Sequence, residues 1–160
     1  MFTRDGLMDL HGWTHGSLDI LLRHIATVPA ERLRESLAGF GIATVWKQLV
    51  HIVEAEEVWV CDLQGKARRP WGEKDCASMD VLLAEKERVR LATRAYLDGL
   101  SDAELNRTLT ERPREWVGEL KSPAFILLHI VTHAFHHKGQ AVAMLRTLGY
   151  PAPDTDLQRG

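Results

Sequence analysis

Four of the eight histidines in this chain of 160 residues fall between positions 129 and 137. His129, His133 and His137 are spaced four residues apart, so on a helix they lie along one face, with His136 on its flank. Two imidazoles at positions i and i+4 can converge on one metal ion, as they do in the helix motif of zinc proteases. The glutamate of that motif is missing, because the sequence contains no His-Glu-x-x-His. The segment therefore predicts a metal site made of imidazoles.

The apolar pattern of residues 126–148 predicts which two histidines face inward. His133 and His137 interrupt an otherwise apolar stripe, made of Ile126, Ile130, Ala141, Met144 and Leu148. His129 lies at the edge of this stripe, and Lys138 and Arg146 are expected on the exposed side. Buried imidazoles need partners for their ring nitrogens, and one metal ion would serve both rings. The alternative is a pair of hydrogen-bonded core histidines, but the i, i+4 spacing favours the metal.

A metal site in a helical core takes ligands from several helices, so a third ligand is expected elsewhere in the chain. His51 is the favoured candidate, because it lies within QLVHIVEAEEVW on a stripe with Ala55 and Val58. Glu56 is an alternative carboxylate ligand, whereas Glu54 and Glu57 are expected on a solvated helix face. Alternative imidazoles lie in the first helix, at His11, His15 and His24.

The pair His11 and His15 also has i, i+4 spacing, but the face that carries it is expected to be less buried. Its neighbours are polar or small: Asp9, Gly12 and Gly16. Around the favoured site, Glu56 and Gln140 are candidates for groups that support the ligands. His129 and His136 are expected outside the ligand set, because three histidines already complete a site with open coordination positions.

Periodic apolar residues predict four long helices, at about 7–27, 42–63, 78–99 and 123–148. A capping box at Ser101–Glu104 predicts one extra turn, Ser122-Pro123 opens the last helix, and Gly149 closes it. Residues 66–75 are expected to be a loop, and residues 106–120 a loop or a short hairpin. The chain is thus predicted to be an all-α four-helix bundle that forms a single domain over residues 1–160.

Composition excludes several classes of protein. The formal net charge is −2, so no basic footprint for nucleic acid is present. No apolar run reaches the roughly 18 residues of a membrane span, and the N-terminus has no apolar signal region, so a cytoplasmic protein is expected. Cys61 and Cys76 are expected to be ordinary reduced thiols, because their spacing does not match a metal-binding pair.

Two segments carry a family resemblance: LVHIVEAEEVW at 49–59 and HIVTHAFHHKGQ at 129–140. The second is similar to the H-x-x-x-H-[KR]-G-Q signature of the DinB/YfiT-like superfamily of metal-dependent enzymes. The resemblance implies an up-down-down-up four-helix bundle, often paired as a homodimer, with metal ligands at His51, His133 and His137. Characterised members include S-transferases that use bacillithiol and a maleylpyruvate isomerase that depends on mycothiol, so a low-molecular-weight thiol is an implied partner.

Three protein ligands leave open positions on a metal, which is typical of a catalytic site. Imidazoles suit zinc or nickel, and also iron or copper, so one divalent transition metal is expected. The sequence thus favours an enzyme that activates a thiol or water toward a small-molecule substrate, either S-transferase-like or hydrolase-like. The alternative is a binding or stress-response protein with a structural or vestigial metal site. Because imidazoles bind metal when neutral and have an ordinary pKa near 6.5, metal-dependent stabilisation is expected to fade as pH falls through about 6.

Overall fold

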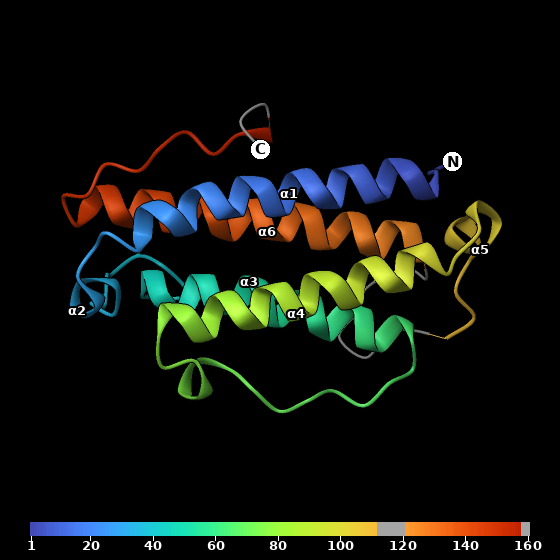
Figure 1. Cartoon of the computed structure of the whole chain (residues 1–160), viewed down its shortest axis with the longest axis horizontal. Helices are drawn as coiled ribbons and strands as arrows, with labels where there is room; N and C mark the ends of the chain where they lie inside the picture. Colours follow the sequence, from blue (N-terminus) through green and yellow to red (C-terminus); the bar gives the residue numbers. More distant parts are fainter. Residues whose placement is uncertain (112–120, 158–160) are drawn as a thin grey trace.

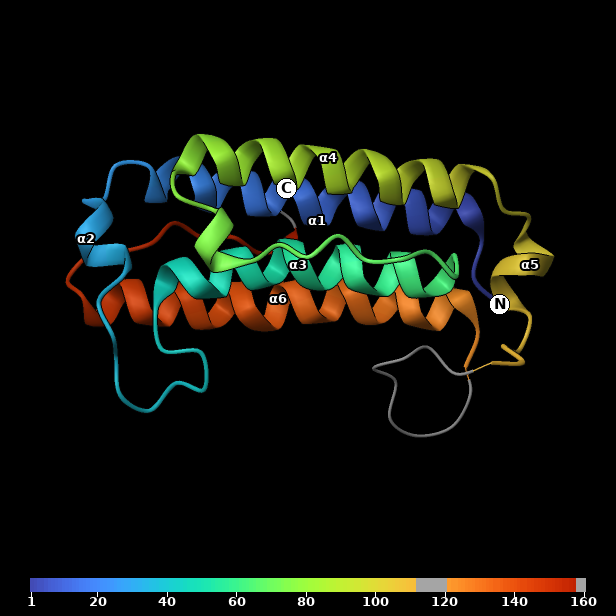
Figure 2. The same ribbon diagram turned by 90° about the horizontal axis from the view of Figure 1, so that it is seen from below.

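The computed structural model describes residues 1–111 and 121–157, and no strand occurs among them. Four long helices lie side by side (Figure 1): α1 (Arg4–Ile25), α3 (Val45–Leu63), α4 (Met79–Asp98) and α6 (Pro123–Thr147). Helices α1 and α4 form one layer and α3 and α6 the other, as Figure 2 shows. Both views show that α1 and α6 run in one direction and that α3 and α4 run in the opposite one. The predicted all-α bundle is confirmed.

Side-chain caps fix where the long helices begin. The hydroxyls of Thr3, Thr44, Ser78 and Ser122 each accept a hydrogen bond from a backbone N–H in the first turn of α1, α3, α4 and α6. Such a bond satisfies one of the donors that a helix start leaves unpaired. The cap at Thr3 starts α1 earlier than the apolar pattern predicts, and the cap at Thr44 starts α3 later. Gly149 follows α6 with a φ of 87°, as predicted for a terminating glycine.

Short elements connect the long helices. Helix α5 (Asp102–Asn106) begins with the predicted capping box of Ser101 and Glu104. A single turn, α2 (Ala30–Leu33), was not expected, and a 3-10 turn, η1 (Glu73–Asp75), interrupts the predicted loop at 66–75. The predicted loop or hairpin at 106–120 lies largely outside the described residues. Residues 64–78 run along α3 (Figure 2) and cover part of its outer side.

The core corrects two expectations about single residues. The helical spacing of Trp13 from Leu10 and Ser17 predicts that it faces the core, yet it is 52% exposed. Lys138, which was expected on the exposed side of the last helix, is only 4% exposed. Its ammonium group lies over the Phe135 ring, 3.6 Å from the ring centroid, and donates hydrogen bonds to the Ser17 hydroxyl and, at 2.5 Å, to the Thr155 carbonyl. A long side chain can thus bury its stem when polar groups meet its charged end.

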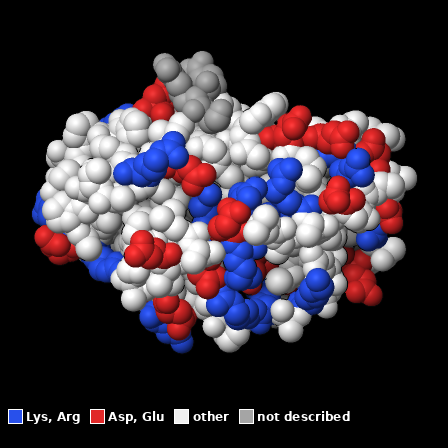
Figure 3. All heavy atoms as spheres, viewed as in Figure 1, with Lys and Arg blue, Asp and Glu red and all other residues white. Residues whose placement is uncertain are grey.

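Basic and acidic side chains are interspersed on the face that Figure 3 shows, and no continuous basic area appears on that face. Interspersed charges are typical of a solvated surface. Among the helices of the described residues, none is long and apolar enough to cross a membrane. Cys61 and Cys76 are free thiols, as expected.

Candidate metal centre

His51 of α3 meets His133 and His137 of α6 between these two helices. The ring centroids lie 5.0 Å apart for His51 and His133, 4.6 Å for His51 and His137, and 4.3 Å for His133 and His137. One donor nitrogen from each ring lies within 4.8 Å of the other two. The three residues that the sequence singled out therefore converge on one point, here called the three-histidine centre. Their role as metal ligands stays a prediction.

Burial keeps these imidazoles neutral. His137 is 8% exposed, as expected for a buried residue, whereas His133, which was also expected to be buried, is only partly buried, as is His51. Burial, followed by the neighbouring histidines, lowers the pKa of His133 to about 3 and that of His137 to about 4. Burial also lowers the pKa of His51. Because a metal binds only deprotonated imidazole, these rings are ready for a metal at neutral pH.

A glutamine pair fixes the orientation of His137. The Gln48 amide nitrogen donates to the Gln140 side-chain oxygen at 2.7 Å and to the Ile42 carbonyl at 2.9 Å, so the Gln48 oxygen is the acceptor that faces the ring. That oxygen lies 2.6 Å from His137 Nδ1, which must therefore carry the proton and leave Nε2 with its lone pair. A hydrogen bond of this kind to the outer nitrogen commonly orients metal-binding histidines.

Gln48 lies three residues before His51 and so shares its helix face, but no role was predicted for it from the sequence. Gln140, which was expected to support the ligands, contacts Gln48 rather than a ligand, and its amide nitrogen donates to His136 Nε2 at 2.7 Å. His136 is exposed and lies outside the ligand group, in keeping with its expected place.

Gln48→Met should lower the metal affinity of the three-histidine centre by about 10- to 100-fold, because loss of such an outer partner frees the ligand ring to reorient. Methionine nearly preserves the volume of the buried side chain, so circular dichroism should show an intact fold. Competition with a chromophoric chelator measures the affinity. Gln64→Met, at the end of α3, is the matched control and should bind metal normally. An unchanged affinity in Gln48→Met would show that this hydrogen bond does not position the ligand.

The donor set fits a divalent transition metal. Three neutral nitrogens face one point, and nitrogen ligands lie about 2.0–2.1 Å from zinc. Nitrogens already within 4.8 Å of one another need only small ring movements to reach such an ion. Three protein ligands also leave at least one coordination position for another molecule.

A cavity of about 360 Å³ lies beside the three-histidine centre. Its wall includes two of the three ligand candidates, His51 and His133. The remaining lining residues are Glu54, Ala55, Val58, Trp59, Arg68 and His129. The ring of His129 lies 5.3 Å from that of Trp59 and 5.6 Å from that of His133, so it forms part of the cavity wall. A small molecule in this cavity would reach the centre from its open side.

Glu54 corrects the expectation of a solvated helix face. It is partly buried, and it lines the cavity together with His51, three residues before it on α3. Burial, followed by the negative charge of Glu57, raises the pKa of Glu54. The i, i+3 spacing from His51 is the sequence signal that identifies Glu54, since residues so spaced share a helix face.

Glu56, His11 and His15 do not join the three-histidine centre. They form a second group on the side of α3 that faces α1 and α4, and each is 5% exposed or less. This corrects the expectation that the face of His11 and His15 is poorly buried. It also removes Glu56 from the candidates for supporting the three-histidine centre. His24 belongs to neither group.

The fold and site together define an all-helical bundle with a histidine cluster between two of its helices. The DinB family matches residues 1–160, and the chain belongs to this family. A DinB-like protein from Bacillus cereus has a similar fold, with a TM-score of 0.70 and 21% sequence identity. The match covers 95% of this chain and 97% of that one. No curated protein gives a significant match. The resemblance to the DinB/YfiT-like superfamily is therefore confirmed.

Proposed function

We propose that the chain is a metal-dependent enzyme that binds one divalent transition metal at His51, His133 and His137. The observation that carries this proposal is the cavity of about 360 Å³ that opens onto His51 and His133. A structural metal site is normally closed by four protein ligands, whereas three ligands beside a cavity suit catalysis. Zinc or nickel suits the three imidazoles best, and iron or copper is also compatible.

The metal, when bound, would supply Lewis acidity that lowers the pKa of a thiol or a water molecule. Glu54 is the residue of the chain that we assign to proton transfer. A carboxyl whose pKa is raised toward neutrality accepts and donates protons more effectively at neutral pH. Its place in the cavity wall with His51 brings it to the substrate side of the centre.

The remaining cavity residues fit a small molecule with both apolar and anionic parts. Val58 and Trp59 offer an apolar surface that excludes water. Arg68 adds a positive charge, and it is held in place by Asp62, with 3.2 Å from Nε to Oδ1 and 2.7 Å from Nη2 to Oδ2. A fixed guanidinium favours carboxylate groups. A low-molecular-weight thiol that carries carboxylates fits this pattern, and thiol transfer to an electrophile is the favoured reaction, with hydrolysis second.

Glu54→Gln should reduce turnover by about 10²- to 10⁴-fold while the metal content stays unchanged, because proton transfer by a positioned side chain contributes that range. The assay screens the metal-loaded protein with low-molecular-weight thiols and electrophiles, and in parallel with ester substrates. Glu87→Gln is the matched control, because Glu87 of α4 pairs with Arg90 and does not line the cavity.

Two results would count against this proposal in different ways. Equal activity in Glu54→Gln and the unsubstituted chain would remove Glu54 from the reaction. An absence of turnover with every substrate, at full metal content, would favour the alternative of a binding or stress-response protein with a non-catalytic metal.

A homodimer is also expected, on the resemblance to the superfamily. Large apolar side chains are exposed on the neighbouring helices α1 and α4: Trp13 is 52% exposed and Leu91 is 53% exposed. Exposed apolar side chains on adjacent helices are typical of a surface that a second protein chain covers. Light scattering at micromolar concentration should report twice the chain mass of 18.1 kDa, and a value of one chain mass would exclude the dimer.

A further inference from the structure

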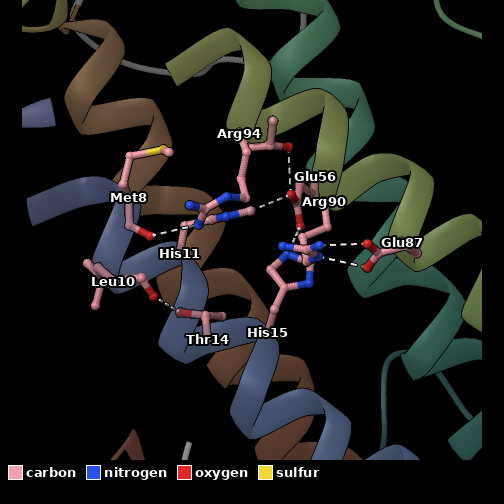
Figure 4. Close-up of polar contacts among 10 residues, drawn as sticks. Met8, Leu10, His11, Thr14, His15, Glu56, Glu87, Arg90 and Arg94 are labelled. Carbon is pink, nitrogen blue, oxygen red and sulfur yellow. Dashed lines mark hydrogen bonds and ion pairs between the residues drawn. The ribbon is translucent and has the colours of Figure 1, made fainter. Parts of the chain in front are cut away.

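A second group of metal-binding side chains lies on the opposite side of α3 from the three-histidine centre. His11 and His15 of α1 point toward Glu56 of α3 (Figure 4). His11 Nε2 lies 2.8 Å from Glu56 Oε1, and His15 Nε2 lies 3.0 Å from Oε2. The Thr93 hydroxyl of α4 donates to Oε1 at 2.6 Å. His11, His15 and Glu56 are here called the His11–His15–Glu56 group. These three residues and Thr93 are all 5% exposed or less.

The donor atoms of this group are already placed for one ion. His11 and His15 are an i, i+4 pair, the spacing at which two imidazoles converge on a metal. Donors that lie about 2.0–2.2 Å from zinc, at roughly right angles or wider, are separated by about 3 Å or somewhat more. The observed separations of 2.8 and 3.0 Å between nitrogens and carboxylate oxygens are close to this spacing. Two imidazoles and one carboxylate are also the donor set of known zinc and iron sites.

The charge of Glu56 gives an independent reason for a cation. Its two carboxyl oxygens face three donor side chains, those of His11, His15 and Thr93, which is the environment of an ionised carboxylate that only accepts hydrogen bonds. In the described ranges, no lysine or arginine contacts it directly. The nearby cations have other partners: Lys86 contacts Asp19 at 2.7 Å, Arg90 contacts Glu87 at 2.6 Å, and Arg94 donates to the Met8 carbonyl at 3.4 Å (Figure 4).

The outer nitrogens of the two imidazoles make no hydrogen bonds to the described residues. Their Nδ1 atoms are buried and have no hydrogen-bond partner in the part of the chain that the structure describes. No lysine or arginine of the described ranges contacts the buried Glu56 carboxylate, and a carboxylate buried without a cation is costly. A metal ion beside the two Nε2 atoms would supply that cation.

We propose that the His11–His15–Glu56 group is a second metal site that takes one divalent transition-metal cation. The ligands are His11 Nε2, His15 Nε2 and the Glu56 carboxylate, and Thr93 supports the carboxylate. Because the group is enclosed by α1, α3 and α4, this metal would be shielded from substrates and would join these helices of the bundle. The proposal does not depend on the catalytic role of the three-histidine centre.

The second site binds more weakly than the first. A metal on Nε2 leaves the ring proton on Nδ1, and neither Nδ1 atom of this group has a partner among the described residues. In the three-histidine centre, by contrast, Gln48 accepts the Nδ1 proton of His137. Since such an outer partner changes metal affinity by about 10- to 100-fold, the second site should be weaker by a similar factor.

The test uses Co²⁺ and a chain that lacks the first site. The variant His51→Ala/His133→Ala/His137→Ala is refolded with Co²⁺, because an enclosed site takes up metal most readily as the chain folds. It should retain one equivalent of Co²⁺. Adding Glu56→Gln should abolish this binding, whereas adding Glu57→Gln should leave it unchanged. The unsubstituted chain should bind two equivalents, the second about 10- to 100-fold more weakly than the first.

Two outcomes would overturn the second site. One is a triple variant with native circular dichroism that binds no Co²⁺, which would leave the group as a hydrogen-bond network only. The other is an unsubstituted chain that binds only one equivalent of Co²⁺ and loses it in His133→Ala. This second result can be obtained even if the Glu56 variants do not fold. If instead the three-histidine centre were wrong, the unsubstituted chain would bind one equivalent and the triple variant would retain it.

Discussion

His133→Ala should lower the metal affinity of the three-histidine centre by more than about 100-fold, since loss of an outer partner alone costs 10- to 100-fold. The ring of His133 lies close to both other ligand candidates, 5.0 Å from that of His51 and 4.3 Å from that of His137. Two remaining imidazoles on separate helices then hold the ion without the i, i+4 pair. Competition with a chelator measures the affinity, and elemental analysis measures the content.

The matched control is His129→Ala. His129 is one turn away on α6, and its ring lines the cavity without belonging to the ligand group. This variant should bind metal nearly as the unsubstituted chain does. Loss of the tightly bound equivalent in His129→Ala, with retention in His133→Ala, would mean that the ligand pair on α6 is shifted by one turn.

Metal binding should stabilise the fold by about 2.7 kcal/mol at a hundredfold excess over Kd, because the unfolded chain has no formed site. The stabilisation should persist at pH 5.5 and be lost as the pH falls through about 4, where His137 and then His133 take up protons in the folded chain. This pH range for the loss of stabilisation is lower than the pH of about 6 that is expected from the ordinary pKa of imidazole. Burial is the cause of the difference, because it disfavours the charged ring.

The metal-free chain should respond to pH differently. Its folded-state imidazoles have lowered pKa values, whereas those of the unfolded chain titrate near pH 6.5. Below that pH the unfolded state binds more protons, so the stability of the metal-free fold falls. Metal affinity of the folded protein, measured by calorimetry at pH 7.5, 6.5 and 5.5, separates the two effects. An affinity that drops sharply between pH 7 and 6 would show that the ligands titrate as exposed histidines do.

The ligand candidates could be predicted from the sequence because they break a local pattern. His133 and His137 interrupt an apolar stripe at helical spacing, and His51 interrupts another. Local signals also predicted the ends of helices, as with the proline and serine that open α6. These signals act within one or two helical turns, so the sequence alone displays them.

The sequence could not show that the His11–His15–Glu56 group is buried, because distant parts of the chain bury it. Asp9, Gly12 and Gly16 make the first helix look poorly covered, yet α4 packs on that side and buries His11 and His15. The same limit applies to Lys138 and Glu54. The former is covered by the tail near Thr155, and the latter contributes to a cavity that the loop residue Arg68 also lines.

Helix α3 positions both groups. His51 and Glu56 are five residues apart on it, so their side chains point to different sides of the helix. One side meets α6 at the three-histidine centre, and the other meets α1 and α4 at the second group. A change in the rotation of α3 would therefore alter both groups together.

The most direct test of the central claim, that His51, His133 and His137 form a metal centre, is a crystal structure of the zinc-loaded protein with anomalous data collected at the zinc edge. The predicted result is an anomalous peak between α3 and α6, about 2.0–2.1 Å from one nitrogen of each of the three rings. A well-ordered zinc-loaded crystal with no anomalous peak among these rings would contradict the claim.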